Sequence, residues 1–121
     1  MAHGDITHIE IPADDLQRAT TFYSELFGWE IKESPEYEGY PMWTAPNGFS
    51  GGAISAREGN LQVPRSFVEV DSIDDTLKRA QELGGRTVQE KSEVSPGSWW
   101  ASFEDSEGNQ IGLYEGVTAA G

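Results

Sequence analysis

Residues 6–28 read ITHIEIPADDLQRATTFYSELFG, and this stretch decides the fold. It opens with alternating apolar and polar side chains, the pattern of a half-buried β-strand that we expect to end at Pro12. Asp14 is the expected N-cap of a following helix, with Gln17 in the capping-box position and Gly28 as the C-cap. Apolar residues recur at helical spacing and predict one buried stripe: Leu16, Ala19, Phe22, Tyr23, Leu26 and Phe27. The stretch predicts a strand followed by an amphipathic helix.

The second part of the chain repeats this unit. Val68-Glu69-Val70 repeats the pattern of Ile9-Glu10-Ile11, and Asp71-Ser72 precede a second helix that Gly84-Gly85 end. Short strands separated by turn residues follow each helix, at 29–33, 40–45, 51–55, 86–91, 98–104 and 110–114. We interpret the chain as one α+β domain, residues 1–121, made of two βαβββ modules: module one at 1–56, a linker at 57–64 and module two at 65–121.

Composition excludes several classes of function. The chain has 21 acidic and 8 basic residues, a formal net charge of −13, which argues against nucleic-acid and membrane-surface partners. It has no cysteine, so a disulfide framework and a thiolate metal site are both impossible. The sequence shows no leader and no apolar run long enough to span a membrane, and we therefore expect a cytoplasmic protein.

Strand alternation predicts which polar side chains face away from the helices. If Ile9 packs under the first helix, then His8 and Glu10 face the other side, and by the same rule Arg65, Phe67 and Glu69 do so in the second module. A buried Arg65 needs a counter-charge, which Glu10 or Glu69 would supply. The alternative is that the two glutamates form a general-base pair. His8 alone also fits a half-buried sheet histidine bonded to a neighbour.

Tryptophans provide the other informative pattern. Trp99 and Trp100 are adjacent on a predicted strand and must point to opposite faces. Alternation places Trp99, Ala101 and Phe103 on one face and Trp100 and Ser102 on the other, and it leaves open which of the two faces is turned to the core. With Trp43 and Tyr114, Trp100 would make an aromatic wall of the kind that holds small organic ligands. Packing into a core or a dimer interface is the alternative for these tryptophans.

Six segments in chain order carry a family resemblance: HIEIPADDL (8–16), FY (22–23), LFGW (26–29), FVEVD (67–71), LGG (83–85) and DSEGNQIGLYE (105–115). Together they resemble the vicinal oxygen chelate superfamily, which includes glyoxalases, bleomycin-resistance proteins and extradiol dioxygenases. The resemblance implies a U-shaped mixed sheet around a cavity, helices on the outer face, and a homodimer. In metal-dependent members the ligands lie on the first and fourth strands of each module.

The metal ligands implied by the resemblance are mostly absent from this chain. His8 matches the first position, but residues 52–55 offer no strong ligand. The third position falls on Arg65, or on Ser66 if the register slips by one, and an arginine has no lone pair to donate. Gly112 stands where a glutamate is usual, which we expect to make room for a bulky ligand. We therefore predict no metal and no cofactor, because a catalytic metal needs about three protein ligands.

Three functions remain open from the sequence. The favoured one is a metal-free protein that binds an aromatic or cationic organic ligand, similar to the drug-sequestering members of the family. Its predicted contacts are His8, Glu10, Trp43, Arg65, Phe67, Glu69, Trp100 and Tyr114. The second is a metal-independent isomerase or lyase that uses His8 or Glu10 as a general base. The third is an interaction module whose cavity is plugged by its own aromatic side chains.

Overall fold

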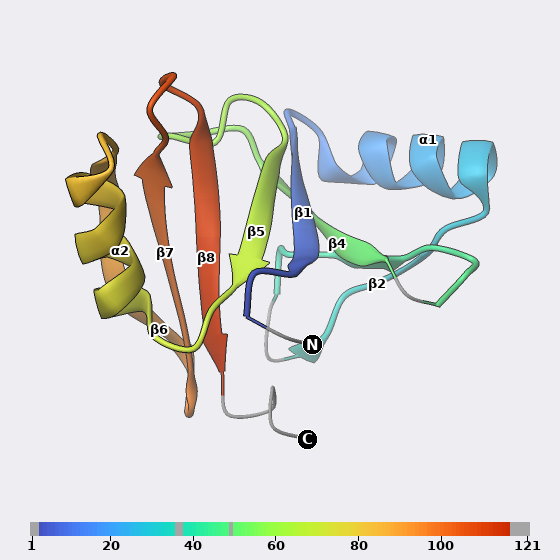
Figure 1. Cartoon of the computed structure of the whole chain (residues 1–121). Coiled ribbons are helices and arrows are strands. Elements are labelled where there is room, and N and C mark those ends of the chain that lie inside the picture. Colours follow the sequence, from blue (N-terminus) through green and yellow to red (C-terminus); the bar gives the residue numbers. More distant parts are fainter. Residues whose placement is uncertain (1–2, 36–37, 49, 117–121) are drawn as a thin grey trace. The chain divides into compact units, whose positions relative to one another are not determined.

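The computed structural model describes residues 3–35, 38–48 and 50–116, and it confirms the α+β class and the repeated order of one strand, one helix and three strands (Figure 1). We call residues 7–65 the first half, and residues 66–116 with residues 3–6 the second half. The first half contains β1 (Ile6–Ala13), α1 (Leu16–Phe27), β2 (Glu30–Lys32), β3 (Met42–Thr44) and β4 (Gly51–Ala56). The second contains β5 (Arg65–Glu69), α2 (Ile73–Glu82), β6 (Arg86–Ser95), β7 (Ser98–Glu104) and β8 (Gln110–Gly116). The division passes through two strands, because Ile6 at the start of β1 belongs to the second half and Arg65 at the start of β5 belongs to the first.

The strands of the first half lie in the order β2-β3-β4-β1. β1 is parallel to β4, and the other two pairs are antiparallel. Gly52 lies opposite Ile9, and a Cβ at Gly52 would overlap the Ile9 carbonyl oxygen. Any side chain at position 52 would therefore collide with the backbone of β1. Pro12 does not end β1, because it pairs in register with Ser55; a parallel strand uses only every second N–H toward a given neighbour and so tolerates a proline.

The α1 helix begins one residue later than predicted. Asp15, not Asp14, is the N-cap, and its carboxylate accepts a hydrogen bond from the backbone N–H of Arg18 at 3.0 Å. Asp14 instead pairs with Arg57 at 3.1 Å. The shift follows from the longer β1, since the chain is still extended at Ala13. Gly28 ends the helix in the left-handed conformation, as predicted.

The core of the first half is built from aromatic rings. Trp43 is 5% exposed and stacks on Trp29 at 3.8 Å between ring centroids, and Trp29 in turn stacks on Tyr23 at 5.1 Å. The predicted helical stripe is only partly buried: three of its large members are 52–58% exposed, namely Phe22, Leu26 and Phe27. Phe22 and Leu26 are four residues apart and so lie on the same side of the helix, and Phe27 lies in its last turn, where its ring contacts Trp29 at 5.4 Å between centroids.

The second half has an aliphatic core under α2. Its strands lie in the order β5-β8-β7-β6, with β5 parallel to β8 and the other pairs antiparallel. The helix begins after the N-cap Ser72 and packs on β6, β7 and β8 (Figure 1). The buried cluster consists of Val70, Ile73, Leu77, Ala101 and Leu113, with Val68, Trp99 and Phe103 packed against it. The predicted alternation along β7 is thereby confirmed.

Two segments outside the regular elements are also well packed. The predicted linker is a folded turn, in which Glu58 bridges to the buried Leu61 and the Arg57 side chain donates to the Gln62 carbonyl oxygen at 2.7 Å. The segment before β1 joins the second half, where the N–H of Gly4 donates to the Glu69 carbonyl oxygen at 2.7 Å. No helix in the described ranges is both long and apolar enough to cross a membrane.

Candidate functional site

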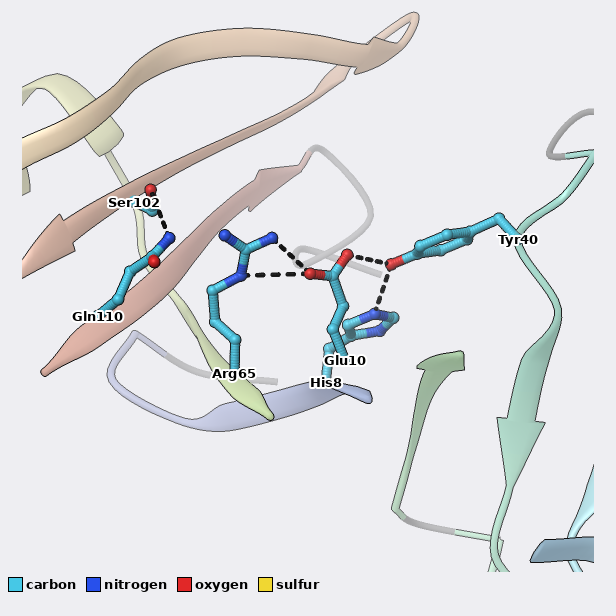
Figure 2. Close-up of polar contacts among 6 residues, drawn as sticks. All are labelled: His8, Glu10, Tyr40, Arg65, Ser102 and Gln110. Atoms are coloured by element: carbon cyan, nitrogen blue, oxygen red, sulfur yellow. Dashed lines mark hydrogen bonds and ion pairs between the residues drawn. The ribbon is translucent and has the colours of Figure 1, made fainter. Parts of the chain in front are cut away.

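Four polar side chains of the first half form one continuous hydrogen-bonded chain (Figure 2). β1 places His8 and Glu10 on its face opposite α1, because the alternating residues Ile9 and Ile11 pack into the core on the other face. The hydroxyl of Tyr40, which precedes β3, lies 3.0 Å from His8 Nε2 and donates to Glu10 Oε2 at 2.7 Å. We call this set, completed by Arg65, the polar chain.

Glu10 is engaged through both of its carboxylate oxygens. Oε1 accepts from Nε and Nη2 of Arg65, at 3.2 and 2.5 Å, while Oε2 accepts from Tyr40. The side chains of Arg65 and Glu10 are 9% and 10% exposed. The prediction that a glutamate neutralises Arg65 is confirmed, and Glu10 is that glutamate. A buried ion pair of this kind holds only when both charges are present, since either alone would be stranded in the interior.

The environment of the polar chain keeps its two titratable rings neutral. Burial lowers the pKa of His8 below its ordinary 6.5, the nearby Arg65 charge lowers it further, and the Glu10 charge opposes both. Burial and the Glu10 carboxylate raise the pKa of Tyr40 far above its ordinary value. Because Tyr40 has one proton and donates it to Glu10, its oxygen must accept from His8, which fixes the proton of the neutral imidazole on Nε2.

The second half carries an aromatic face opposite α2. Phe67 lies opposite Gly112, Tyr114 lies opposite Trp100, and the rings of Phe67 and Trp100 are 6.3 Å apart. Gly112 does not open space for a ligand as we expected, because a Cβ there would lie 2.6 Å from the Phe67 ring. The absence of a side chain at Gly112 accommodates this ring. Ser102 lies opposite Gly112 on β7, and its buried hydroxyl accepts a hydrogen bond from Gln110 at 3.4 Å (Figure 2).

Glu69 lies on this same aromatic face, two residues after Phe67 on β5 and opposite Tyr114. It is only 6% exposed. Yet no side chain or backbone group in the described ranges makes a hydrogen bond or an ion pair with its carboxylate. Glu10 and Glu69 thus occupy matching sequence positions in the two halves but differ completely in their partners.

Trp43 does not share a face with His8 and Glu10. It pairs in register with Gly52, which pairs with Ile9, so its ring lies on the α1 side of the strands in the first-half core. We therefore remove Trp43 from the predicted ligand contacts and assign it to packing. Its indole Nε1 has no hydrogen-bond partner among the described residues, although it is fully enclosed.

Tyr40 is the member of the polar chain that sequence reasoning missed. It lies 30 residues from Glu10, at the first position of the strand predicted at 40–45 and two residues before the observed β3, and the nearby acidic loop gives no indication of its role. One general rule indicates that Tyr40 has a polar partner if it is buried, because a buried tyrosine hydroxyl needs a hydrogen bond. The identity of that partner depends on how the chain returns to β1, which periodicity does not encode.

The side chains at the expected ligand positions do not fit a divalent metal. Within the described ranges, no group of three or more histidine, aspartate or glutamate side chains is close enough to hold one ion. His8 is hydrogen-bonded to Tyr40, Arg65 is a cation, and Gly112 is covered by the Phe67 ring. A single imidazole is too few donors for a catalytic site.

Comparisons with known proteins were made by sequence and by structure. A family model described as bleomycin resistance protein-like N-terminal matches residues 5–45. A glyoxylase-like domain-containing protein from Didymella fabae is 32% identical over 116 residues, covering 88% of this chain and 90% of the relative. Lactoylglutathione lyase from Salmonella typhimurium is 28% identical over 128 residues, with 94% of each chain covered. The solved structure of methylmalonyl-CoA epimerase from Mycobacterium tuberculosis has a TM-score of 0.72 at 19% identity, over 100% of this chain and 95% of that one, a likeness of fold alone.

Proposed function

The chain belongs to the vicinal oxygen chelate superfamily, and on that premise we propose that it is a small-molecule-binding protein of the glyoxalase/bleomycin-resistance type. It holds an aromatic or cationic organic ligand against the strand faces opposite its helices, without a resident metal and without turnover. The observation that carries this proposal is that both oxygens of Glu10 are already engaged, by Arg65 and by Tyr40.

Glu10 is poorly suited to act as a general base. A base must offer a lone pair within hydrogen-bond reach of the proton that it removes. Each Glu10 oxygen instead accepts a hydrogen bond within the protein, and protonating the carboxylate would break its ion pair with Arg65. The polar chain is better suited to orienting a bound ligand as a rigid polar surface, because its hydrogen bonds hold the four side chains in place.

The second half supports the choice of ligand. Phe67, Trp100 and Tyr114 give it an aromatic surface, and Glu69 adds a carboxylate to that surface. Aromatic rings bind other rings by stacking and bind cations through their negative faces. The formal net charge of −13 also favours the approach of cations over anions.

A thermal-shift screen of aromatic and cationic compounds tests the proposal, using protein dialysed against EDTA and checked by elemental analysis. At least one compound is expected to raise the melting temperature and to saturate its site at a one-to-one stoichiometry in calorimetry. The compound is expected to be recovered chemically unchanged. Conversion of the compound at catalytic rates, or binding that returns only with one divalent metal per chain, would contradict the proposal.

One observation favours a second candidate function, proton transfer by His8. Its lowered pKa keeps the imidazole neutral near pH 7, and a neutral imidazole is able to accept a proton. The two functions are distinguished by the rate at which added carbonyl compounds exchange the hydrogen atoms on the carbon next to the carbonyl for deuterium. This rate is measured by proton NMR in D2O. A binding protein leaves the exchange rate unchanged, whereas a catalyst accelerates it and the H8Q variant does not.

The assembly and location predicted from the sequence complete the proposal. We propose a cytoplasmic homodimer that functions without a nucleic-acid or membrane partner. Size-exclusion chromatography with light scattering is expected to give twice the chain mass. A monomer at micromolar concentration would contradict the homodimer.

A further inference from the structure

Glu69 is a buried carboxylate without a counter-charge in the part of the chain that the structure describes. It is 6% exposed, slightly less than Glu10 at 8%. The Glu10 carboxylate receives two bonds from Arg65 and one from Tyr40, whereas no described group donates to the carboxylate of Glu69. Holding an unpaired carboxylate away from water is costly, so this position is unfavourable unless a cation or donor arrives from outside the chain.

The basic residues of the second half do not neutralise Glu69. Arg86 pairs with Glu104 at 2.6 Å, and Lys91 pairs with Glu115 at 3.3 Å. Lys91 also lies over the ring of Trp99, on the core side of β7, and the remaining two basic residues, Lys78 and Arg79, are exposed on α2. Within the described part of this half, each cation is therefore committed elsewhere or lies on the helix.

Arg65 is also an unsuitable partner for Glu69. The two residues lie on the same face of β5 but are four positions apart, roughly 13 Å along an extended strand. The Arg65 guanidinium is held by Glu10 through two of its nitrogens. Between the two charged residues stands Phe67, whose ring covers Gly112.

The immediate neighbours of Glu69 on its face are aromatic. Tyr114 lies directly opposite it on β8, and Trp100 lies opposite Tyr114 on β7. Facing side chains on adjacent strands lie about 5 Å apart at Cβ, so these rings and the carboxylate border one patch. The carboxylate keeps some contact with solvent, because among the described residues Trp43 Nε1 is the fully enclosed side-chain polar atom that has no partner.

We propose that Glu69, Trp100 and Tyr114 form a subsite for an organic cation, an alkylammonium or guanidinium group on the ligand. This inference rests on the proposed small-molecule binding and names the chemical class that the second half selects. The carboxylate supplies the counter-charge, and the rings favour a cation with apolar substituents over a hydrated inorganic ion. A divalent metal is disfavoured here, since one carboxylate is far short of the ligands that such an ion needs.

The test compares three probes of similar size that differ in charge: benzyltrimethylammonium, benzyl alcohol and benzoate. Binding is measured by calorimetry at low salt for the wild type, E69Q and E93Q. E69Q keeps the shape of the side chain and removes its charge. E93Q is the matched control, because it removes the same charge from an exposed glutamate of the second half. Circular dichroism confirms that both variants are folded.

The wild type is expected to bind benzyltrimethylammonium at least tenfold more tightly than benzyl alcohol, and benzoate least. In E69Q the ratio of the affinities for benzyltrimethylammonium and benzyl alcohol is expected to fall at least tenfold. In E93Q this ratio is expected to stay as in the wild type. Equal binding of cation and alcohol, or an unchanged preference in E69Q, would overturn the cation subsite while leaving small-molecule binding intact. Binding of none of the probes would also overturn it, and the wider screen described above would then decide separately whether the protein binds any ligand.

Discussion

The two halves of the molecule follow the same order of elements but handle their buried charges differently. In the first half, the glutamate in the middle of the opening strand is held by Arg65 and Tyr40. In the second half, the carboxylate of the glutamate at the matching position, Glu69, has no partner among the described residues and is bordered by aromatic rings. One half thus uses its carboxylate for internal structure, and we propose that the other presents its carboxylate to a ligand.

The cores differ in the same way. α1 packs on stacked aromatic rings, and none of its side chains is fully buried. α2 instead buries Ile73 completely and Leu77 almost completely. A repeated backbone pattern therefore does not imply repeated chemistry. Because alternation assigns only the face of each side chain, the partner of each charge is free to differ between the halves.

The largest effect is expected from removing the ring at the centre of the first-half core. Trp43→Ala should lower the free energy of unfolding by about 4 kcal/mol, because it deletes a 5% exposed indole stacked on Trp29. Trp100→Ala, on the aromatic face of the second half, should cost about 2 kcal/mol, since that ring is only half-buried. Urea unfolding followed by circular dichroism measures both. Equal losses would show that the two tryptophans do not differ in their structural role.

The next effect compares the two glutamates directly. Arg65→Met should cost about 3 kcal/mol, because it leaves Glu10 buried without its counter-charge. Adding Glu10→Gln to that variant should restore part of the loss. Glu69→Gln should not lower the free energy of unfolding and should raise it by up to about 1 kcal/mol, because it removes a buried charge that has no counter-charge among the described residues. A loss for Glu69→Gln as large as that for Arg65→Met would mean that Glu69 is also paired within the protein.

The smallest effect concerns His8 and pH. Its pKa in the folded state lies below the ordinary 6.5, so as the pH falls below that value the unfolded chain binds a proton that the folded chain does not. The free energy of unfolding should therefore decrease with falling pH until the folded-state pKa is passed. Denaturation at about pH 7.5 and about pH 5.5 should show a smaller decrease for His8→Gln than for the wild type. An identical decrease in both would assign the pH dependence to other groups.

Much of the fold follows from periodicity in the sequence. The order of elements, the Gly28 cap, the faces of Ile9 and Val68 and the alternation along β7 were all predictable from patterns within about ten residues of each position. Boundaries were less predictable: β1 continues through Pro12, and the cap moves from Asp14 to Asp15. Whether a proline ends a strand depends on the direction of its partner strand, which is a tertiary property.

The candidate site was predicted in part. The salt bridge between Arg65 and a glutamate followed from the rule that a buried cation needs a counter-charge, but the choice of Glu10 over Glu69 did not. The prediction that Gly112 makes room for a ligand was wrong. The sequence shows only that a side chain is missing there, and the structure shows that the Phe67 ring fills the space. Tyr40 was missed because its partners lie 30 and 32 residues away.

The class of fold, the repeat of strand and helix, the acidic charge and three of the four members of the polar chain followed from the sequence alone. These properties depend on side-chain type and on spacing along one strand or one helix, which are local. The tertiary structure was needed to show that Arg65 neutralises Glu10, that the Glu69 carboxylate has no partner among the described residues, that Trp43 belongs to the core, and that Phe67 covers Gly112. Each of these outcomes depends on which atoms meet across separate strands, and that meeting is set by register and packing rather than by local pattern.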